Sequence, residues 1–166
     1  VEYYIFTVFF YLFKLLPYHK ASWLGGFLLE KIAVIFGANK IARKNIKFVF
    51  PELSRAEREN ILQNMWNNLG RIFAEFPHIF GMSDMQYRDL VQIEGEKYLQ
   101  QLKGKPFIMF SAHFSNWEVI SRYFIMQKLP VNMIYRAANN HFINQDIIKI
   151  REQQTLRMYE KGVKGT

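Results

Sequence analysis

The feature that most constrains the fold is an apolar, aromatic segment near the start of the chain. Residues 3–16 have the sequence YYIFTVFFYLFKLL, and a proline closes them. A helix needs about 20 consecutive apolar residues to cross a bilayer, and a lysine interrupts this run well before that length. A second apolar stretch, residues 21–37, carries the charged pair Glu30-Lys31 at its middle. We therefore expect residues 1–37 to form membrane-associated helices that lie at an interface.

The distribution of charge points to an anionic partner. The net charge is +8, and residues 14–58 hold nine Lys or Arg against three Asp or Glu. Such a surface attracts phosphate, either of nucleic acid or of anionic lipid, although a solvated helix face is the simpler alternative. The neighbouring apolar segments favour a membrane surface, and no nucleic-acid-binding module is visible. We therefore expect no nucleic acid among the partners.

Cysteine usage removes several classes of site. The chain has no cysteine, which excludes a disulfide framework, a Cys-ligated zinc site and a cysteine nucleophile. No metal site and no cofactor are expected. The chain begins at Val1 and ends at Thr166 without a terminating pattern, so we expect a fragment of a longer protein.

Helical signals dominate the first half. Residues 42–50 form a basic helix that Pro51 ends. Ser54 and Glu57 then fit a capping box, and apolar residues follow at helical spacing until Pro77, where the helix should end. Trp66 and the Phe residues of this helix are expected to belong to the core.

The pattern changes after residue 90 to alternating strands and helices. The expected elements are a strand at 91–95, a helix at 96–102, a strand at 106–111, a helix at 116–127, a strand at 131–135 and a helix at 142–160. The apolar run PFIMFS at 106–111 is typical of a buried parallel strand. Strand, helix and strand over about 30 residues predict a βαβ unit. The fold class is therefore α/β, with a βαβ core in residues 38–166.

Chemistry-bearing residues cluster where the expected strand at 106–111 meets its helix. Active sites collect at the carboxyl ends of such strands. There His113 begins the turn and Glu118 follows five residues later. Imidazole can take a proton from an attacking hydroxyl, and a carboxylate on its other nitrogen fixes the tautomer. The alternative is that His113 caps a helix and Glu118 is an ordinary surface residue.

The segment from His113 to Glu118 resembles the H-x4-D/E signature of glycerolipid acyltransferases, in the form found in bacterial lipid A late acyltransferases. Other segments are similar to that family in the same order: Ala42-Arg43-Lys44-Asn45-Ile46, Phe50-Pro51-Glu52-Leu53-Ser54, Asn68-Leu69-Gly70-Arg71, Glu75-Phe76 and Ile134-Tyr135-Arg136. The match runs from about residue 20 to the end. The family usually has Gly where this chain has Ser115. It also has later strands, with an Asp-Gln segment, that have no counterpart here.

The resemblance implies a role for each matching residue. It makes His113 the general base and Glu118 its carboxylate partner. Asn116 and Trp117 shape the turn and help to bind substrate, and Arg136 contacts an anionic substrate group. Arg151 matches a further substrate-binding position. An arginine at a strand end also often just pairs with a neighbouring acid, so that alternative stays open for Arg136.

The family's activity gives the functional expectation. It is transfer of a fatty acyl chain from an acyl carrier protein thioester to a hydroxyl of a lipid A precursor, in lipopolysaccharide biosynthesis, at the cytoplasmic face of the inner membrane. The glycolipid acceptor and the carrier protein are the expected partners. Two alternatives remain open: a phosphatidylinositol mannoside acyltransferase, and a non-catalytic membrane-binding remnant of a truncated gene. In every case this chain is the N-terminal part of the acyltransferase domain, and the fold is incomplete.

Overall fold

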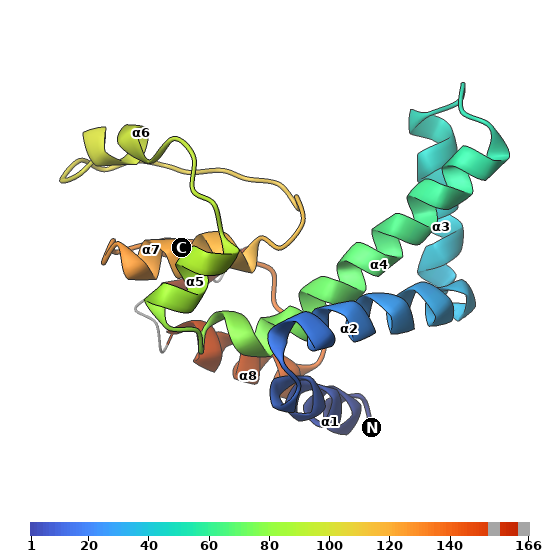
Figure 1. The fold of residues 1–166 in the computed structure, drawn as a ribbon, viewed down its shortest axis with the longest axis horizontal. Coiled ribbons are helices and arrows are strands. Elements are labelled where there is room, and N and C mark those ends of the chain that lie inside the picture. Colours follow the sequence, from blue (N-terminus) through green and yellow to red (C-terminus); the bar gives the residue numbers. More distant parts are fainter. Residues whose placement is uncertain (153–156, 163–166) are drawn as a thin grey trace.

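The computed structural model describes residues 1–152 and 157–162, and most of them are helical (Figure 1). The helices are α1 (Glu2–Leu15), α2 (Tyr18–Ile32), α3 (Gly37–Val49), α4 (Arg55–Ile79), α5 (Asp84–Leu90), α6 (Glu96–Gln101), α7 (Glu118–Met126) and α8 (His141–Glu152), with a 3-10 turn at Ala33–Ile35. Two strands, β1 (Asn132–Tyr135) and β2 (Arg157–Glu160), form a parallel pair. The chain is thus a mixed α/β protein in which helices predominate.

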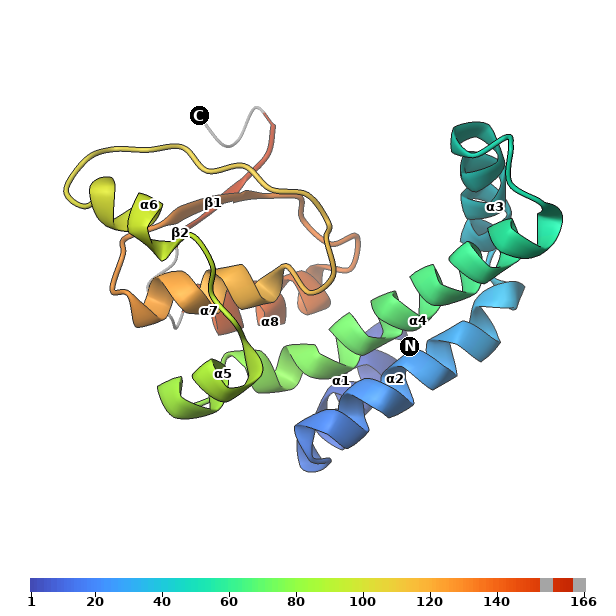
Figure 2. The same ribbon diagram turned by 45° about the horizontal axis from the view of Figure 1, so that its top comes forward.

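The long helix α4 contacts α1, α2, α3 and α7, and α2 runs beside it in both views (Figures 1 and 2). Glycines let the two backbones approach closely. A Cβ atom added to Gly25 would lie 2.5 Å from the carbonyl oxygen of Gly70, so no side chain fits there. Ala21 and Ala74 are fully buried at the same interface.

The first half of α4 carries a small apolar core under α3. Its buried members are Ala33, Leu62 and Trp66. The Trp66 indole Nε1 donates a hydrogen bond to the Asn39 side-chain oxygen at 3.0 Å, which satisfies its polar atom inside the core. The expectation that Trp66 is a core residue is confirmed, but the same expectation is wrong for Phe73, which is 60% exposed.

The predicted start of α4 is confirmed, and the helix ends two residues beyond its predicted end. The Glu57 amide donates to Ser54 Oγ at 3.3 Å and the Ser54 amide donates to a Glu57 carboxylate oxygen at 2.8 Å, as in a capping box. The helix continues through Pro77 to Ile79, whereas we expected it to end by Pro77. Proline removes only one backbone donor, and here that loss falls in the last turn.

The βαβ core expected at 106–135 is not formed. Its helix appears as α7 and its second strand as β1, but residues 106–111 are extended chain with no strand partner, as are residues 91–95 (Figure 2). Ile108 is 95% exposed and Phe110 is 94% exposed. A strand forms only where a neighbour accepts its backbone hydrogen bonds, and no described strand lies on this segment. The strand that does pair with β1 is β2, within the expected helix 142–160, which ends at Glu152.

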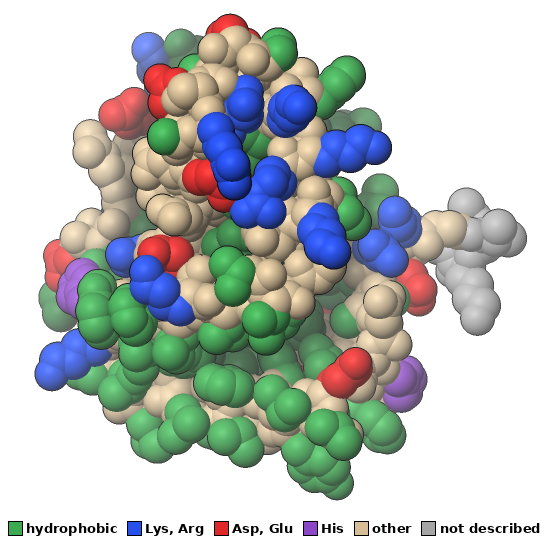
Figure 3. Space-filling view, turned by 90° about the vertical axis from the view of Figure 1, so that its right-hand side faces the viewer, with side chains coloured by type: hydrophobic (Ala, Val, Ile, Leu, Met, Phe, Trp, Pro, Cys, Tyr) green, Lys and Arg blue, Asp and Glu red, His purple; other side chains and the backbone are tan. Residues whose placement is uncertain are grey.

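The surface separates charge from apolar side chains. On the face shown in Figure 3, Lys and Arg gather at the end that carries α3, and hydrophobic side chains cover the lower part. No residue of α1 is buried, and its large exposed side chains are Tyr4, Ile5, Val8, Phe9, Tyr11, Leu12 and Leu15. Among the described residues no single helix is long and apolar enough to cross a membrane. One bent pair of helical segments, Tyr18–Ile35 and Gly37–Val49, is together long and apolar enough for a membrane span, but the two segments meet at an angle of 92°.

Candidate active site

The turn that carries the predicted site residues leads directly into α7. Ser115 has a φ of 47°, in the left-handed region, which costs a residue with a side chain about 1–2 kcal/mol. The Asn116 side-chain oxygen accepts a hydrogen bond from the Glu118 amide at 3.2 Å. This bond satisfies one of the free N–H groups at the start of α7, so Asn116 fixes how the turn meets the helix.

Glu118 is buried and fully engaged. Its side chain is 3% exposed and forms an ion pair with Arg151, whose Nε donates to Oε2 at 3.3 Å and whose Nη2 donates to Oε1. The Trp117 indole Nε1 donates to the same carboxylate at 3.1 Å. The alternative that Glu118 is an ordinary surface residue is wrong.

His113 is exposed and lies against Trp117. The two ring centroids are 4.7 Å apart, with the rings edge to face at 82°. Among the hydrogen bonds of residues 1–152 and 157–162, none joins His113 to Glu118. Trp117 contacts both, so the structure brings the three residues together through the indole.

A second buried carboxylate, Glu75 of α4, lies behind the turn. Glu75 is 8% exposed; its Oε2 accepts from the Asn116 side-chain amide at 2.6 Å and its Oε1 accepts from Ser22 Oγ at 2.6 Å. Burial, together with the charge of Glu75 and a hydrogen bond to it, raises the pKa of the Tyr18 hydroxyl to about 12. The sequence analysis assigned Glu75 no role. The sequence signal that could have identified Glu75 is its place on the apolar face of α4, between Ile72 and Ile79.

An apolar cavity of about 600 Å³ opens beside the turn. Aromatic rings of α1 and α4 and aliphatic side chains of α2 form most of its wall: Phe6, Phe9, Phe10, Phe13, Phe73, Phe76, Leu28, Leu29 and Ile32. The polar part of the wall includes Glu118, Arg136 and Arg151, and Trp117 also lines it. The volume lies within the range of small-molecule binding sites. Four of the six predicted site residues therefore meet at one cavity.

The two predicted arginines differ in what they contact. Arg136 follows β1, is exposed, and forms no hydrogen bond or ion pair with any described residue. The alternative that it pairs with a neighbouring acid is therefore not seen in the described structure. Arg151 on α8 is bound to Glu118, and its guanidinium carbon lies 6.0 Å from the centre of the Phe76 ring.

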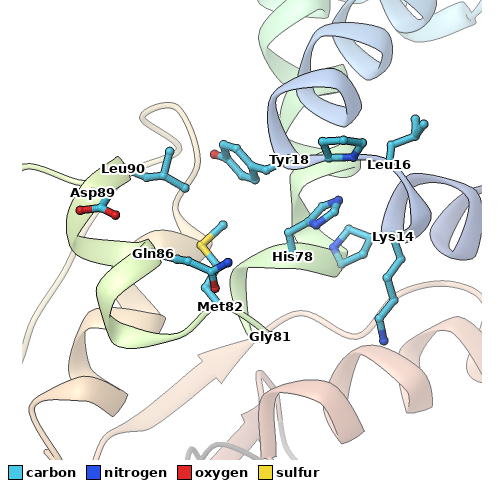
Figure 4. A pocket seen from close by; sticks show the side chains of 11 residues that line it. Lys14, Leu16, Tyr18, His78, Gly81, Met82, Gln86, Asp89 and Leu90 are labelled. Carbon is cyan, nitrogen blue, oxygen red and sulfur yellow. The ribbon is translucent and has the colours of Figure 1, made fainter.

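A second cavity, of about 490 Å³, lies on the other side of the α1–α2 corner (Figure 4). Figure 4 shows His78 between Tyr18 and Lys14, with Met82 and Gln86 on the opposite wall. The His78 ring nitrogen Nε2 is 2.9 Å from the Phe13 carbonyl oxygen, which ties the end of α4 to α1. None of the predicted site residues lines this cavity. In the part of the chain that the structure describes, no group of three His, Cys, Asp or Glu side chains could hold a metal ion.

Comparison with known proteins places the chain in a family. Residues 1–164 match the family described as "Bacterial lipid A biosynthesis acyltransferase". The chain is 26% identical over 132 residues to the "Lipid A biosynthesis acyltransferase" of Haemophilus influenzae, a match that covers 78% of this chain and 42% of that protein. It is 28% identical over 105 residues to the "Lipid A biosynthesis palmitoleoyltransferase" of Escherichia coli, covering 62% of this chain and 34% of that protein.

The chain thus spans less than half the length of these relatives. No solved structure matches it significantly. The family match over nearly the whole chain, in agreement with the motif residues at the cavity, shows that this chain belongs to the bacterial lipid A biosynthesis acyltransferase family.

Proposed function

We propose that the full-length protein transfers a fatty acyl chain from an acyl carrier protein thioester to a hydroxyl of a lipid A precursor. The observation that carries this proposal is the apolar cavity whose wall includes Trp117 and Glu118, next to His113. A fatty acyl chain fits an aromatic and aliphatic wall because burying its methylenes releases water, at about 0.8 kcal/mol for each. The names of the two relatives favour lipid A over a phosphatidylinositol mannoside as the acceptor.

In the proposed mechanism His113 is the general base. Its imidazole takes the proton of the acceptor hydroxyl as that oxygen attacks the thioester carbonyl carbon; the tetrahedral intermediate collapses to an ester and the thiolate leaves. Proton transfer of this kind typically contributes about 10²–10⁴-fold to the rate. Glu118 is the proposed carboxylate partner of the imidazole. Because Trp117 contacts both side chains and no hydrogen bond joins His113 to Glu118 among the described residues, the proposal requires the His113 and Trp117 side chains to change rotamer when substrate binds, on a backbone turn that stays in place.

Arg136 and Arg151 are proposed to lie at the polar part of the bound substrate. Arg136 is proposed to bind an anionic group, since its guanidinium has no described protein partner and lines the cavity. A guanidinium binds phosphate or carboxylate through two parallel hydrogen bonds. Asn116, Trp117 and Arg151 are proposed to shape the same site, and Arg151 does so through its ion pair with Glu118.

We also propose that the exposed apolar face of α1 and the basic run of α3 rest on the cytoplasmic face of the inner membrane. The basic residues Lys40, Arg43, Lys44 and Lys47 are exposed on α3, and the face shown in Figure 3 carries both basic and hydrophobic side chains, so one surface offers both kinds of contact. The same positive charge suits an acidic carrier protein. The domain boundaries at 1–37 and 38–166 remain a prediction.

The test uses the full-length protein with an acyl carrier protein thioester and a lipid A precursor, and measures acyl transfer. His113→Ala should lower kcat by about 10²–10⁴-fold without changing the melting temperature, because His113 is exposed. The matched control is His19→Ala, an exposed histidine of α2 outside the cavity, which should transfer at the wild-type rate. Near wild-type transfer by folded His113→Ala would overturn the mechanism. No transfer by the wild-type enzyme would favour the non-catalytic alternative.

A further inference from the structure

We propose that Glu75 is a positioning residue, which holds the turn 113–118 in place through Asn116. The proposal rests on the function proposed above for its catalytic meaning, although the structural link can be tested without it. Glu75 lies on α4 and is separated from Asn116 by 41 positions in the sequence. The hydrogen bond between them at 2.6 Å therefore ties the turn to the most firmly packed helix of the molecule.

Asn116 uses both ends of its amide. Its NH₂ group donates to Glu75 and its oxygen accepts from the Glu118 amide at 3.2 Å. One side chain thus connects the carboxylate on α4 to the first residue of α7. A shift of Asn116 would move the start of α7, and with it the Glu118 carboxylate and the Trp117 indole that lies on His113.

The position requires a group that only accepts hydrogen bonds. The Glu75 carboxylate accepts from the Ser22 hydroxyl of α2 and from the Asn116 side-chain amide, and its charge and a hydrogen bond to it contribute, after burial, to the raised pKa of Tyr18 on α2. An ionised carboxylate offers about four acceptor sites and no donor. Within the described residues Glu75 forms no ion pair, but Arg71 Nη1 donates to Ser22 Oγ at 3.2 Å and so lies one hydrogen bond away.

Arg71 donates to the Ser22 oxygen, so the Ser22 hydroxyl hydrogen points to residue 75 and holds the oxygen of a glutamine placed there. The NH₂ group of that glutamine then faces Asn116, and the chain of hydrogen bonds breaks at one of two places. If Asn116 keeps its orientation, two donors oppose each other and the bond between α4 and the turn is lost. If Asn116 then turns its oxygen toward the glutamine, its NH₂ group faces the Glu118 amide and the cap of α7 is lost. In either case one of the two hydrogen bonds that hold the turn 113–118 is lost. A purely structural role through Ser22 and Tyr18 would be preserved, because the glutamine oxygen can still accept from a hydroxyl.

The same logic predicts a compensating pair. Asn116→Asp alone places two carboxylates against each other, which is unfavourable in a buried site. In Glu75→Gln combined with Asn116→Asp, the glutamine donates to one oxygen of the new carboxylate. The other oxygen still accepts from the Glu118 amide. The double variant therefore restores both links with their donors and acceptors exchanged.

The experiment compares the full-length wild-type protein with the two single variants and the double variant, by hydrogen–deuterium exchange of peptides covering residues 111–120 and by acyl transfer. Each single variant should exchange faster in these peptides and lose about 10–100-fold in kcat with little change in KM, as expected for misplaced catalytic groups. The double variant should return to wild-type exchange and to within about threefold of wild-type kcat. Glu57→Gln, on the same helix, is the control, because a glutamine preserves the capping box.

The outcomes separate the two proposals. The positioning role is overturned if the losses of kcat in the two single variants multiply in the double variant. It is also overturned if the single variants show unchanged hydrogen–deuterium exchange in residues 111–120. If Glu75→Gln does not fold, Asn116→Ala serves instead: it removes both links and must accelerate exchange at 111–120, and unchanged exchange would overturn the proposal. If the exchange pattern follows the prediction but the wild-type protein transfers no acyl group, the proposed function fails and the link between Glu75 and the turn stands.

Discussion

The helix pair α2–α4 and the attachment of α7 illustrate two ways of holding a helix. In the pair, backbone meets backbone: Gly25 and Gly70 leave no room for a side chain beside the buried Ala21 and Ala74, although hydrogen bonds such as that from Ser22 to Glu75 also join the two helices. In contrast, α7 is held by polar side chains. Its contacts are Glu118 with Arg151, Arg122 with Asp84 and the Met82 carbonyl, Tyr87 with the Val119 carbonyl, and Asn116 with Glu75.

The difference shows where specific chemistry is required. Close packing depends on shape, so small changes in volume should disrupt α2–α4 whatever their polarity. The attachment of α7 depends on matched donors, acceptors and charges, so isosteric changes of charge should disrupt it instead. Such polar contacts have definite directions, and they place the candidate site next to the cavity.

The largest effect is expected from the buried ion pair. Glu118→Gln keeps the size of the side chain but leaves the Arg151 guanidinium, 15% exposed, without its counter-charge. Removing one partner of a buried pair costs about 3–5 kcal/mol. Urea unfolding should show this loss, and replacing both partners, as in Glu118→Leu with Arg151→Met, should recover most of it.

The surface pair between α3 and α4 is the control for this prediction. Arg43 and Glu59 also form a bidentate ion pair, but their side chains are 49% and 32% exposed. Glu59→Gln should therefore cost less than about 1 kcal/mol. Equal losses for Glu118→Gln and Glu59→Gln would mean that burial of the pair at α7 contributes nothing.

Gly70→Val tests shape at the other interface. A Cβ atom at this position would meet the Gly25 backbone and the Leu29 Cβ at 2.8 Å, and backbone cannot yield as a flexible side chain does. Overpacking of this kind costs about 1–3 kcal/mol or more. Thermal unfolding of Gly70→Val should show the loss, whereas Gly37→Val, where no atom lies within 4 Å, should lose much less. If both variants unfold at the wild-type temperature, the two helices are not held by close packing.

A smaller, pH-dependent effect is expected at Tyr87. Its hydroxyl donates to the Val119 carbonyl at 2.9 Å, and burial, against the opposing charge of Arg122, raises the pKa of Tyr87 to about 12. An unfolded tyrosine ionises near pH 10. Between these values the unfolded chain loses the proton and the folded chain keeps it, so this contribution to stability is complete below pH 10 and falls as the pH rises.

Tyr87→Phe should therefore cost about 1 kcal/mol at pH 7, and the difference from wild type should shrink between pH 10 and pH 12. Tyr11→Phe is the control, since that ring is exposed on α1. A difference that stays constant over this pH range would contradict the assignment of the shift to Tyr87.

The helices could be predicted from the sequence because their signals are local. The capping box at Ser54 and the periodic apolar residues mark α4 directly, and α1, α3 and α7 follow from similar patterns. A second capping box, Ser83 with Gln86, marks the start of α5, which the sequence analysis did not predict. Strands depend on distant partners. The apolar run at 106–111 has the composition of a strand but finds no neighbour among the described residues, so composition alone misplaced it.

The candidate site was predictable in part for a similar reason. His113, Asn116, Trp117 and Glu118 are neighbours in sequence, so a motif identifies them together. The residues that surround them come from elsewhere: Arg151 pairs with Glu118 from α8, and Glu75 reaches Asn116 from α4. No pattern of spacing reveals such pairs, because only the folded chain brings those helices to the turn.

The smallest predicted effect concerns the turn itself. Ser115 has a φ of 47°, a conformation that costs a residue with a Cβ atom about 1–2 kcal/mol. Glycine removes this cost but loses about 0.5–1 kcal/mol through the greater freedom of the unfolded chain. Ser115→Gly should therefore stabilise the protein by about 0.5 kcal/mol in urea unfolding. Ser111→Gly, at a position without a positive φ, should instead destabilise it slightly. If Ser115→Gly is the less stable of the two, the turn does not adopt this conformation in solution.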